Sequence, residues 1–176
     1  IAEWIVAMDG PRRADLSRIW TERKGQIMLR LPLGPVELTC KADRIEQQAD
    51  GRYVIIDYKT GAPPTDKQVR AGLSSQLPLE AMMLVMGGFA EIPAGAIGAL
   101  EYWRLSGGDP AGTRRPLKGR LEELIGEAEH GLLQLIEVFD NPVTPYRSRP
   151  APEYAPRHSD YEHLARVKEW SAAGQV

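Results

Sequence analysis

The chain has 176 residues, of which 43% are hydrophobic and 26% are charged, and its formal net charge is −2. These values are typical of one globular domain with its own core, and they argue against a protein that binds nucleic acid through a large overall positive charge. The single cysteine, Cys40, excludes an intrachain disulfide and a four-cysteine zinc or iron–sulfur site. The most apolar run, Ala81 to Ala90, is far shorter than the roughly 20 residues of a membrane span, so we expect no membrane partner.

The N-terminal part predicts helical segments followed by a β-hairpin. Residues 1–20 carry apolar side chains at intervals of three and four, interrupted at Gly10-Pro11, which predicts two short helices. Alternating residues over 25–31, a turn at Gly34-Pro35 and a second alternating run over 36–43 predict the hairpin. In the second run the even positions are expected on one face and the odd positions, which end with Asp43, on the other.

The middle of the chain predicts a third strand and a buried helix. Asp50-Gly51 is a strong turn signal, and the continuous run Tyr53–Ile56 after it is typical of a central strand. Residues 65–72 predict an exposed loop or short helix. Apolar spacing from Ser74 or Ser75 to Met86 predicts a buried helix, which Gly87-Gly88 ends.

The C-terminal part alternates between regular and irregular segments. Residues 96–105 predict a strand, 106–116 a loop rich in Gly and Pro, 117–139 a long amphipathic helix and 161–170 a last short helix. The Pro-rich tail over 141–156 excludes a regular element there. The order of elements predicts an α/β layer architecture, with a core over residues 1–140 and a Pro-rich C-terminal extension over 141–176.

Three polar side chains are expected to meet where two strands end. Asp43 closes the second strand, while Asp57 and Lys59 project from one sheet face at the end of the third. Counting from the Asp50-Gly51 turn, Asp43 and Asp57 are nearly opposite, where side chains approach to about 5 Å. Two such carboxylates repel unless a cation lies between them, and Mg²⁺ usually takes one or two protein carboxylates. A lysine there can neutralise charge on a phosphoryl group, so the set predicts metal-assisted phosphodiester hydrolysis. Alternatively, Asp57 and Lys59 form an ordinary ion pair.

Three segments around these residues resemble known nuclease motifs. Residues 42–46, 55–61 and 76–80, which read ADRIE, IIDYKTG and QLPLE, resemble the motifs of the RecB-family exonuclease branch of the PD-(D/E)XK nuclease superfamily. The stretch from Val36 to Phe89 is most similar to the C-terminal nuclease domains of AddB-type proteins, which are subunits of AddAB helicase–nucleases. The resemblance implies a restriction-endonuclease-like α/β core, in which helices flank a central mixed sheet.

The resemblance also implies an activity and its setting. It points to a bacterial cytoplasmic deoxyribonuclease that uses Mg²⁺, or Mn²⁺ in vitro, and acts as an exonuclease on a strand fed by a helicase. The process would be recombinational repair of double-strand breaks, and the partners would be DNA and an AddA-like helicase–nuclease subunit. The sequence contains no Gly-x-x-x-x-Gly-Lys-Ser/Thr loop, so an ATP-driven motor would belong to another part or another chain.

Individual residues acquire roles from the same resemblance. Asp43, Asp57 and the backbone carbonyl of Tyr58 would be the metal ligands, and Lys59 would be the catalytic lysine. Gln76, at the start of a helix, would contact DNA or help to fix the site. Further candidate DNA contacts are Thr60, Lys67 and Arg70, and a basic edge or a solvated loop is expected around Arg114, Arg115, Lys118 and Arg120.

The sequence departs from the family pattern at three points. Relatives take a further His or Glu ligand from an upstream helix, and this ligand has no clear counterpart here, although Glu3 is a candidate. Because the chain opens at Ile1 in mid-pattern, we expect a segment of a longer protein that lacks this helix. Many relatives have Tyr where this chain has Glu80, which we expect on the solvated side of its helix; the alternative is an additional acidic group near the site. With one cysteine, the iron–sulfur cluster of many AddB-type proteins cannot form.

Two alternatives to a helicase-coupled exonuclease stay open. The first is a catalytically silent, nuclease-like module that binds DNA or scaffolds a partner, against which the intact set of Asp43, Asp57 and Lys59 argues. The second is a different nuclease of the same superfamily, such as a restriction enzyme or a viral exonuclease.

Overall fold

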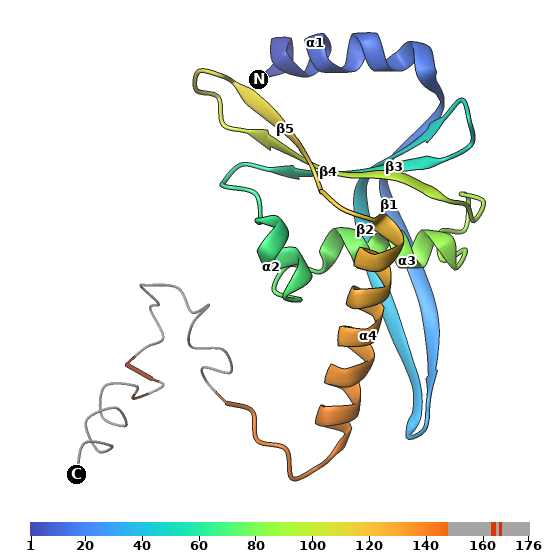
Figure 1. Ribbon diagram of the computed structural model, residues 1–176, viewed down its shortest axis with the longest axis vertical. Coiled ribbons are helices and arrows are strands. Elements are labelled where there is room, and N and C mark those ends of the chain that lie inside the picture. Colours follow the sequence, from blue (N-terminus) through green and yellow to red (C-terminus); the bar gives the residue numbers. More distant parts are fainter. Residues whose placement is uncertain (148–162, 165, 167–176) are drawn as a thin grey trace. The chain divides into compact units, whose positions relative to one another are not determined.

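A five-stranded mixed sheet with helices on both faces forms the centre of the chain (Figure 1). The computed structural model describes residues 1–147, 163, 164 and 166. The strands are β1 (Leu16–Leu31), β2 (Gly34–Gln48), β3 (Tyr53–Lys59), β4 (Ile97–Leu105) and β5 (Gly112–Pro116). The helices are α1 (Ala2–Arg12), a 3₁₀ turn η1 (Arg13–Asp15), α2 (Asp66–Arg70), α3 (Gln76–Val85) and α4 (Leu121–Asp140).

Strand order in the sheet follows the sequence, β1-β2-β3-β4-β5. Neighbouring strands are antiparallel except β3 and β4, which are parallel because α2 and α3 form the crossover between them. Gly34, the first residue of β2, and Gly51, in the turn between β2 and β3, have φ of 136° and 85°, a conformation that glycine adopts without a steric cost. The predicted α/β class, a mixed sheet flanked by helices, is confirmed.

Apolar clusters hold the helices to the two faces of the sheet. Figure 1 shows α1 on one face and α3 on the other. The larger cluster joins the sheet to α3 and α4, and its most buried members include Ile45, Ile55, Leu77, Ala81 and Leu100. The smaller cluster joins the sheet to α1 through Trp4, Met8, Val54, Ile56 and Trp103. Odd positions of β3 therefore face α3, and even positions face α1.

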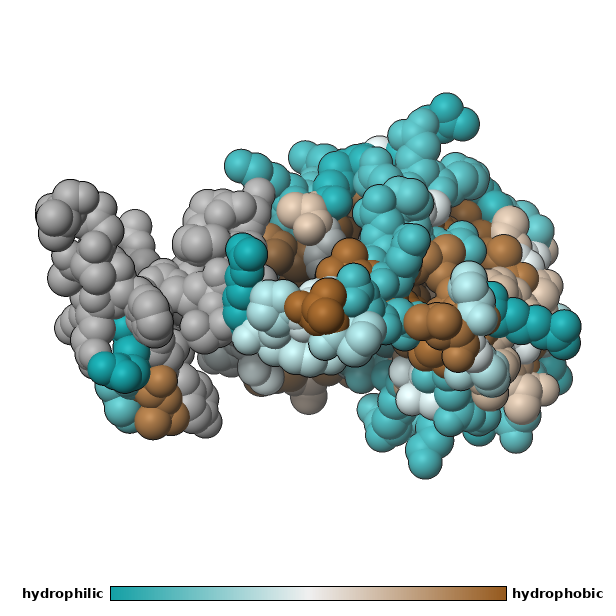
Figure 2. Space-filling view, turned by 90° about the horizontal axis from the view of Figure 1, so that it is seen from below, coloured by the Kyte–Doolittle hydropathy of each residue, from teal (hydrophilic) through white to brown (hydrophobic). Residues whose placement is uncertain are grey.

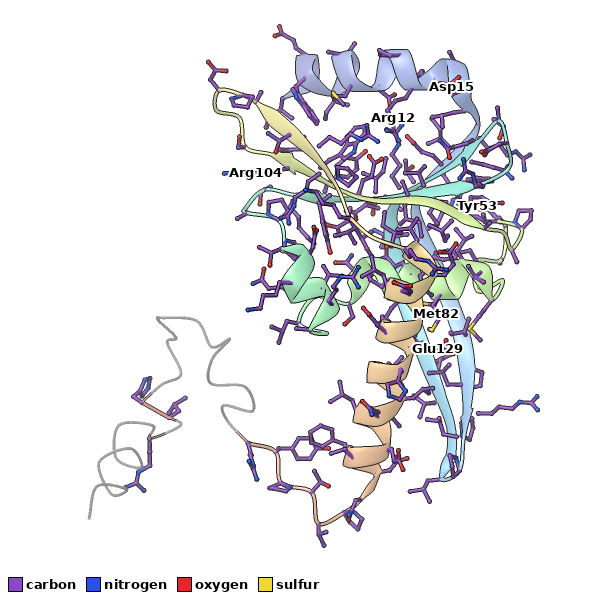
Figure 3. The ribbon with its side chains drawn as sticks, viewed as in Figure 1. Arg12, Asp15, Tyr53, Met82, Arg104 and Glu129 are labelled. Atoms are coloured by element: carbon purple, nitrogen blue, oxygen red, sulfur yellow. The ribbon has the colours of Figure 1, made fainter. Side chains whose placement is uncertain are left out.

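Charged side chains are also buried between α1 and the sheet. Arg44 of β2 forms ion pairs with Asp9 of α1 and with Glu46. Arg12, which reaches from the end of α1 toward the sheet in Figure 3, contacts Glu46 and lies 3.5 Å from Glu101. Burial opposes ionisation of Asp9, but hydrogen bonds from Arg13 and Arg44 outweigh it and lower the pKa of Asp9. This back-face ion network fixes α1 on the sheet.

Replacing Arg44 with methionine is expected to destabilise the protein by about 1.5–3 kcal/mol, because it removes the cation that Asp9 and Glu46 share while each keeps one other arginine. Urea unfolding of the variant measures this loss. The exposed Arg30 on β1 provides the control: Arg30→Met is expected to change stability by less than about 0.5 kcal/mol. Equal effects of the two substitutions would contradict a stabilising role for the network.

Four details differ from the elements that the sequence predicts. Residues 16–20, predicted as helix, belong to β1, because Trp20 pairs with Ile45 and tertiary strand pairing overrides the local spacing. α1 continues through Gly10 and Pro11 instead of stopping before them. The predicted loop over 106–116 contains β5, which pairs with β4. The long amphipathic helix predicted over 117–139 begins at Leu121, four residues later than predicted.

The chain divides into two compact units, residues 1–137 and 138–176. The predicted functional boundary near residue 140 stays a prediction, and most of the predicted helix over 161–170 lies outside the described residues. In the part of the chain that is described, no helix combines the length and apolar character needed to cross a membrane. Apolar side chains on the face seen in Figure 2 form separate patches within a largely hydrophilic surface.

Candidate active site

Asp43 and Asp57 lie opposite each other where β2 and β3 stop pairing. Arg44 pairs with Ile56, so Asp43 and Asp57 occupy the next position along the two strands. The Asp43 carboxylate accepts a hydrogen bond of 2.9 Å from the backbone N–H of Tyr58. This bond takes the place of a ladder hydrogen bond and fixes the Asp43 side chain against β3.

The side-chain alternation of β2 shifts by one residue around Asp43. Before it, Leu38, Cys40 and Ala42 face α3, as their contacts with the larger apolar cluster indicate; after it, Ile45 does so. The predicted alternation therefore holds only as far as Ala42. At the same place Glu22 of β1, which lies opposite Asp43, has a left-handed φ of 54°, and the strand pairing skips this position without a change of register.

Lys59 forms an ion pair with Asp57 on the face of the sheet that α3 covers. Its Nζ lies 3.0 Å from Oδ1 and 2.8 Å from Oδ2 of Asp57, and it donates a 3.3 Å hydrogen bond to Oε1 of Gln76. Asp57 is 2% exposed. Burial raises the pKa of Asp57, the hydrogen bond and charge of Lys59 oppose the rise, and the charge of Asp43 adds to it.

Glu80, one turn after Gln76 on α3, also belongs to this site. It is buried, and its Oε1 accepts a 3.1 Å hydrogen bond from Nε2 of Gln76, while Oε2 is buried without a hydrogen-bond partner among the described residues. Burial raises the pKa of Glu80 to about 7; the Gln76 hydrogen bond lowers it, and the charges of Asp57 and Asp43 raise it further.

The burial of Glu80 corrects the expectation that it lies on the solvated side of its helix and agrees with the alternative of an additional acidic group near the site. Leu77, Ala81 and Leu84, at positions i−3, i+1 and i+4 from Glu80, are buried on the face of α3 that packs on the sheet, and this spacing was a usable signal. Tyr102 is a residue that the sequence did not predict at the site. It pairs with Asp57 across β3 and β4, and burial together with the charges of Asp57 and Glu80 raises the pKa of its hydroxyl.

The donor atoms of this site fit a hard divalent cation. Asp43, Asp57 and Glu80 offer carboxylate oxygens whose charges act on one another, and the unpartnered Oε2 of Glu80 leaves acceptor capacity. Oxygen donors of this kind are those that Mg²⁺ prefers. Within the described ranges, no three His, Cys, Asp or Glu side chains already form a group that could hold a metal ion. The ligand set of Asp43, Asp57 and the Tyr58 backbone carbonyl therefore stays a prediction.

Other predicted site residues lie elsewhere or have partners. Thr60 and Lys67 are exposed beyond β3 and on α2. Arg70 is hydrogen-bonded to Glu127 of α4 at 3.2 and 3.3 Å, which occupies its guanidinium. Glu3 lies exposed on α1, on the opposite face of the sheet from Asp57, so it is wrong as a stand-in for the upstream ligand.

The expected basic edge is largely neutralised. Arg114 donates to Glu101, which is buried, at 2.7 Å, and Arg115 lies 3.4 Å from Asp66. Arg120 lies 3.2 Å from Glu123. These arginines serve local ion pairs, so the solvated alternative describes this region better than a free phosphate-binding edge.

The chain is similar in sequence to several proteins, and one solved structure aligns with part of it. It is 37% identical over 86 residues to an uncharacterised protein of Rickettsia conorii and 38% identical over 84 residues to one of Rickettsia felis. These matches cover 49% and 48% of this chain but 10% of each relative, so the chain corresponds to a small part of their length. The crystal structure of SSO0001 aligns with 76% of this chain and 58% of its own, at 10% identity and a TM-score of 0.42.

A family model described as the PD-(D/E)XK nuclease superfamily matches residues 3–166. This range includes the whole sheet and the site formed by Asp43, Asp57 and Lys59. Since the match extends over far more than half of the sequence, the chain belongs to the PD-(D/E)XK nuclease superfamily.

Proposed function

We propose that the chain is a Mg²⁺-dependent deoxyribonuclease domain that hydrolyses phosphodiester bonds of a DNA strand. The observation that carries the proposal is the arrangement of Asp43, Asp57 and Lys59, in which a buried carboxylate is paired with a lysine 2.8 Å away and faces a second carboxylate across two strands. Residues 1–140 form the nuclease core in this proposal, and residues 141–176 a C-terminal extension.

The site residues divide the chemistry between them. Asp43, Asp57 and the backbone carbonyl of Tyr58 would hold the ion, which supplies a Lewis acid for a phosphoryl oxygen and lowers the pKa of bound water. Lys59 places a positive charge where negative charge develops during phosphoryl transfer. Gln76 orients the Lys59 ammonium by accepting one of its hydrogen bonds, and its amide also holds the Glu80 side chain.

The biological setting is proposed from the motif resemblance. The segments at Asp43, Asp57 to Gly61 and Gln76 support a RecB-family exonuclease of the AddB type, acting in the bacterial cytoplasm with an AddA-like helicase–nuclease subunit. Relatives about ten times longer than the matched stretch are compatible with a nuclease domain inside a larger protein. In this setting the domain degrades a strand that the helicase delivers during repair of double-strand breaks.

The decisive experiment measures degradation of end-labelled single-stranded DNA by the purified protein, alone and with its helicase subunit, in Mg²⁺ and in EDTA. We expect cleavage only with Mg²⁺ and at least an approximately 100-fold loss in Asp57→Asn, which retains the side-chain shape but removes the ligand charge. Cleavage that persists in this variant would exclude Asp57 from the site. DNA binding with no cleavage under any condition would support the silent, DNA-binding alternative instead.

A further inference from the structure

A cavity of about 260 Å³ lies between β2 and α3, beside the candidate active site. Its apolar wall is formed by Leu38, Leu79 and Met83, and Cys40 lines it from β2. Gln76 and Glu80 form part of its polar lining. The combination of an apolar wall with a few convergent polar groups is typical of small-ligand sites.

The cavity is connected to the phosphodiester site through its polar lining. Gln76 accepts a hydrogen bond from Lys59 at 3.3 Å through Oε1 and donates one to Glu80 at 3.1 Å through Nε2. Gln76 thus belongs both to the cavity and to the Lys59–Asp57 pair. The cavity therefore lies next to the Lys59–Asp57 pair.

We propose that the cavity holds the nucleobase beside the phosphodiester that is cleaved, and that it makes the site selective for single-stranded DNA; this rests on the proposed nuclease function. Its volume is just below the range of about 300–1,000 Å³ for small-molecule pockets, so it suits one base and not a base pair. Leu38, Leu79 and Met83 can contact the face of a base. Glu80 is buried, and its Oε2, which has no hydrogen-bond partner among the described residues, provides an acceptor for ring or exocyclic N–H groups at the edge of the base.

Strand selectivity follows from what the base must do to enter. The cavity is half open, and a base can enter it between β2 and α3 only after it leaves the helical stack and its pairing partner. In a single strand this separation costs far less than in a duplex. The cavity therefore favours a delivered single strand without any contact to a particular sequence.

Filling the cavity tests this role in catalysis. Leu38→Trp places a large ring at the wall, away from Asp43, Asp57 and Lys59, and we expect it to raise KM for single-stranded DNA about tenfold. On a strand with one abasic nucleotide beside the cleaved bond, the KM of the parent should also rise about tenfold. The KM of the Leu38→Trp variant should rise little further on this strand, because its cavity is already filled. The control is Met28→Trp, at an exposed position of the same hairpin, with melting curves recorded for all proteins.

Chemical labelling of Cys40 provides a readout that does not depend on cleavage. Cys40 is the only cysteine in the chain and lines the cavity, so its alkylation by N-ethylmaleimide at pH 9 in EDTA reports on occupancy. The tetranucleotide (dA)₄ is expected to slow labelling severalfold, whereas an abasic tetramer and a duplex should not. The control is Cys40→Ser, because any N-ethylmaleimide that this variant takes up has reacted with groups other than Cys40.

The two proposals fail differently. If the parent cleaves DNA with Mg²⁺ but Leu38→Trp behaves as the parent does, or the abasic tetramer protects Cys40 as well as (dA)₄, the cavity proposal is wrong and the nuclease proposal stands. If the parent never cleaves DNA, the nuclease proposal is wrong, and base-dependent protection of Cys40 then reports on binding alone. A Leu38→Trp protein that does not fold leaves the labelling experiment to decide.

Discussion

Replacing Lys59 with alanine is expected to lower metal-dependent cleavage of single-stranded DNA by at least about 100-fold, the effect of removing one group that stabilises transition-state charge. In the structure its Nζ lies within 3.0 Å of both Asp57 carboxylate oxygens and also donates to Gln76. Removal of this ammonium leaves the phosphoryl group without that charge and leaves the buried Asp57 carboxylate without its cation. The measurement is the single-turnover rate at saturating Mg²⁺.

Two controls separate a catalytic effect from a general one. Lys24→Ala removes an exposed lysine of β1 and is expected to cleave at the parental rate. Binding of single-stranded DNA in Ca²⁺, followed by fluorescence anisotropy, should change only slightly in Lys59→Ala, because one phosphate contact contributes little to total affinity. Parental cleavage by a folded Lys59→Ala protein would remove Lys59 from the mechanism.

Replacing Glu80 with glutamine is expected to stabilise the metal-free protein at pH 8 but not at pH 5. Burial raises the pKa of Glu80 from 4.5 to about 7, so the folded state binds the proton more tightly than the unfolded state. The protein therefore loses stability as the pH rises from the ordinary pKa of 4.5 to the raised pKa of about 7, and the loss is complete above the raised value. The size of the pKa shift corresponds to a loss of about 3 kcal/mol in the free energy of unfolding at pH 8. Glutamine avoids this loss because its side chain is never charged.

Urea unfolding in EDTA at the two pH values checks this prediction. The difference between Glu80→Gln and parent should be on the order of 2–3 kcal/mol larger at pH 8 than at pH 5. Glu137→Gln, at an exposed position of α4, is the matched control and should show no such pH dependence. A Glu80→Gln difference that stays constant between pH 5 and pH 8 would contradict the raised pKa.

The raised pKa of Glu80 also indicates that this carboxyl has a role in the site. The same carboxyl that is costly to ionise in the metal-free protein lies among Asp43, Asp57 and Lys59, whose charges act on it. Sites that bind cations or nucleotides commonly retain such groups at the expense of stability. Stabilisation by Glu80→Gln together with a loss of cleavage would indicate this trade-off.

Much of the site was predictable from the sequence, because its geometry is local. The turn at Asp50-Gly51 sets the register of β2 and β3, and that register places Asp43 opposite Asp57. The two-residue period of a strand puts Asp57 and Lys59 on one face, and they form an ion pair there. The mixed α/β class likewise follows from the order of the predicted elements.

Only the tertiary structure decided which distant residues join this site. The face of α3 that packs on the sheet brings in Glu80, and the parallel pairing of β3 and β4 brings in Tyr102; α1 docks on the opposite face and keeps Glu3 away. Residues 16–20 became strand for the same reason, since pairing with β2 outweighs a helical spacing. Periodicity and turn chemistry act over a few residues, whereas burial and pairing partners depend on the packing of the whole chain.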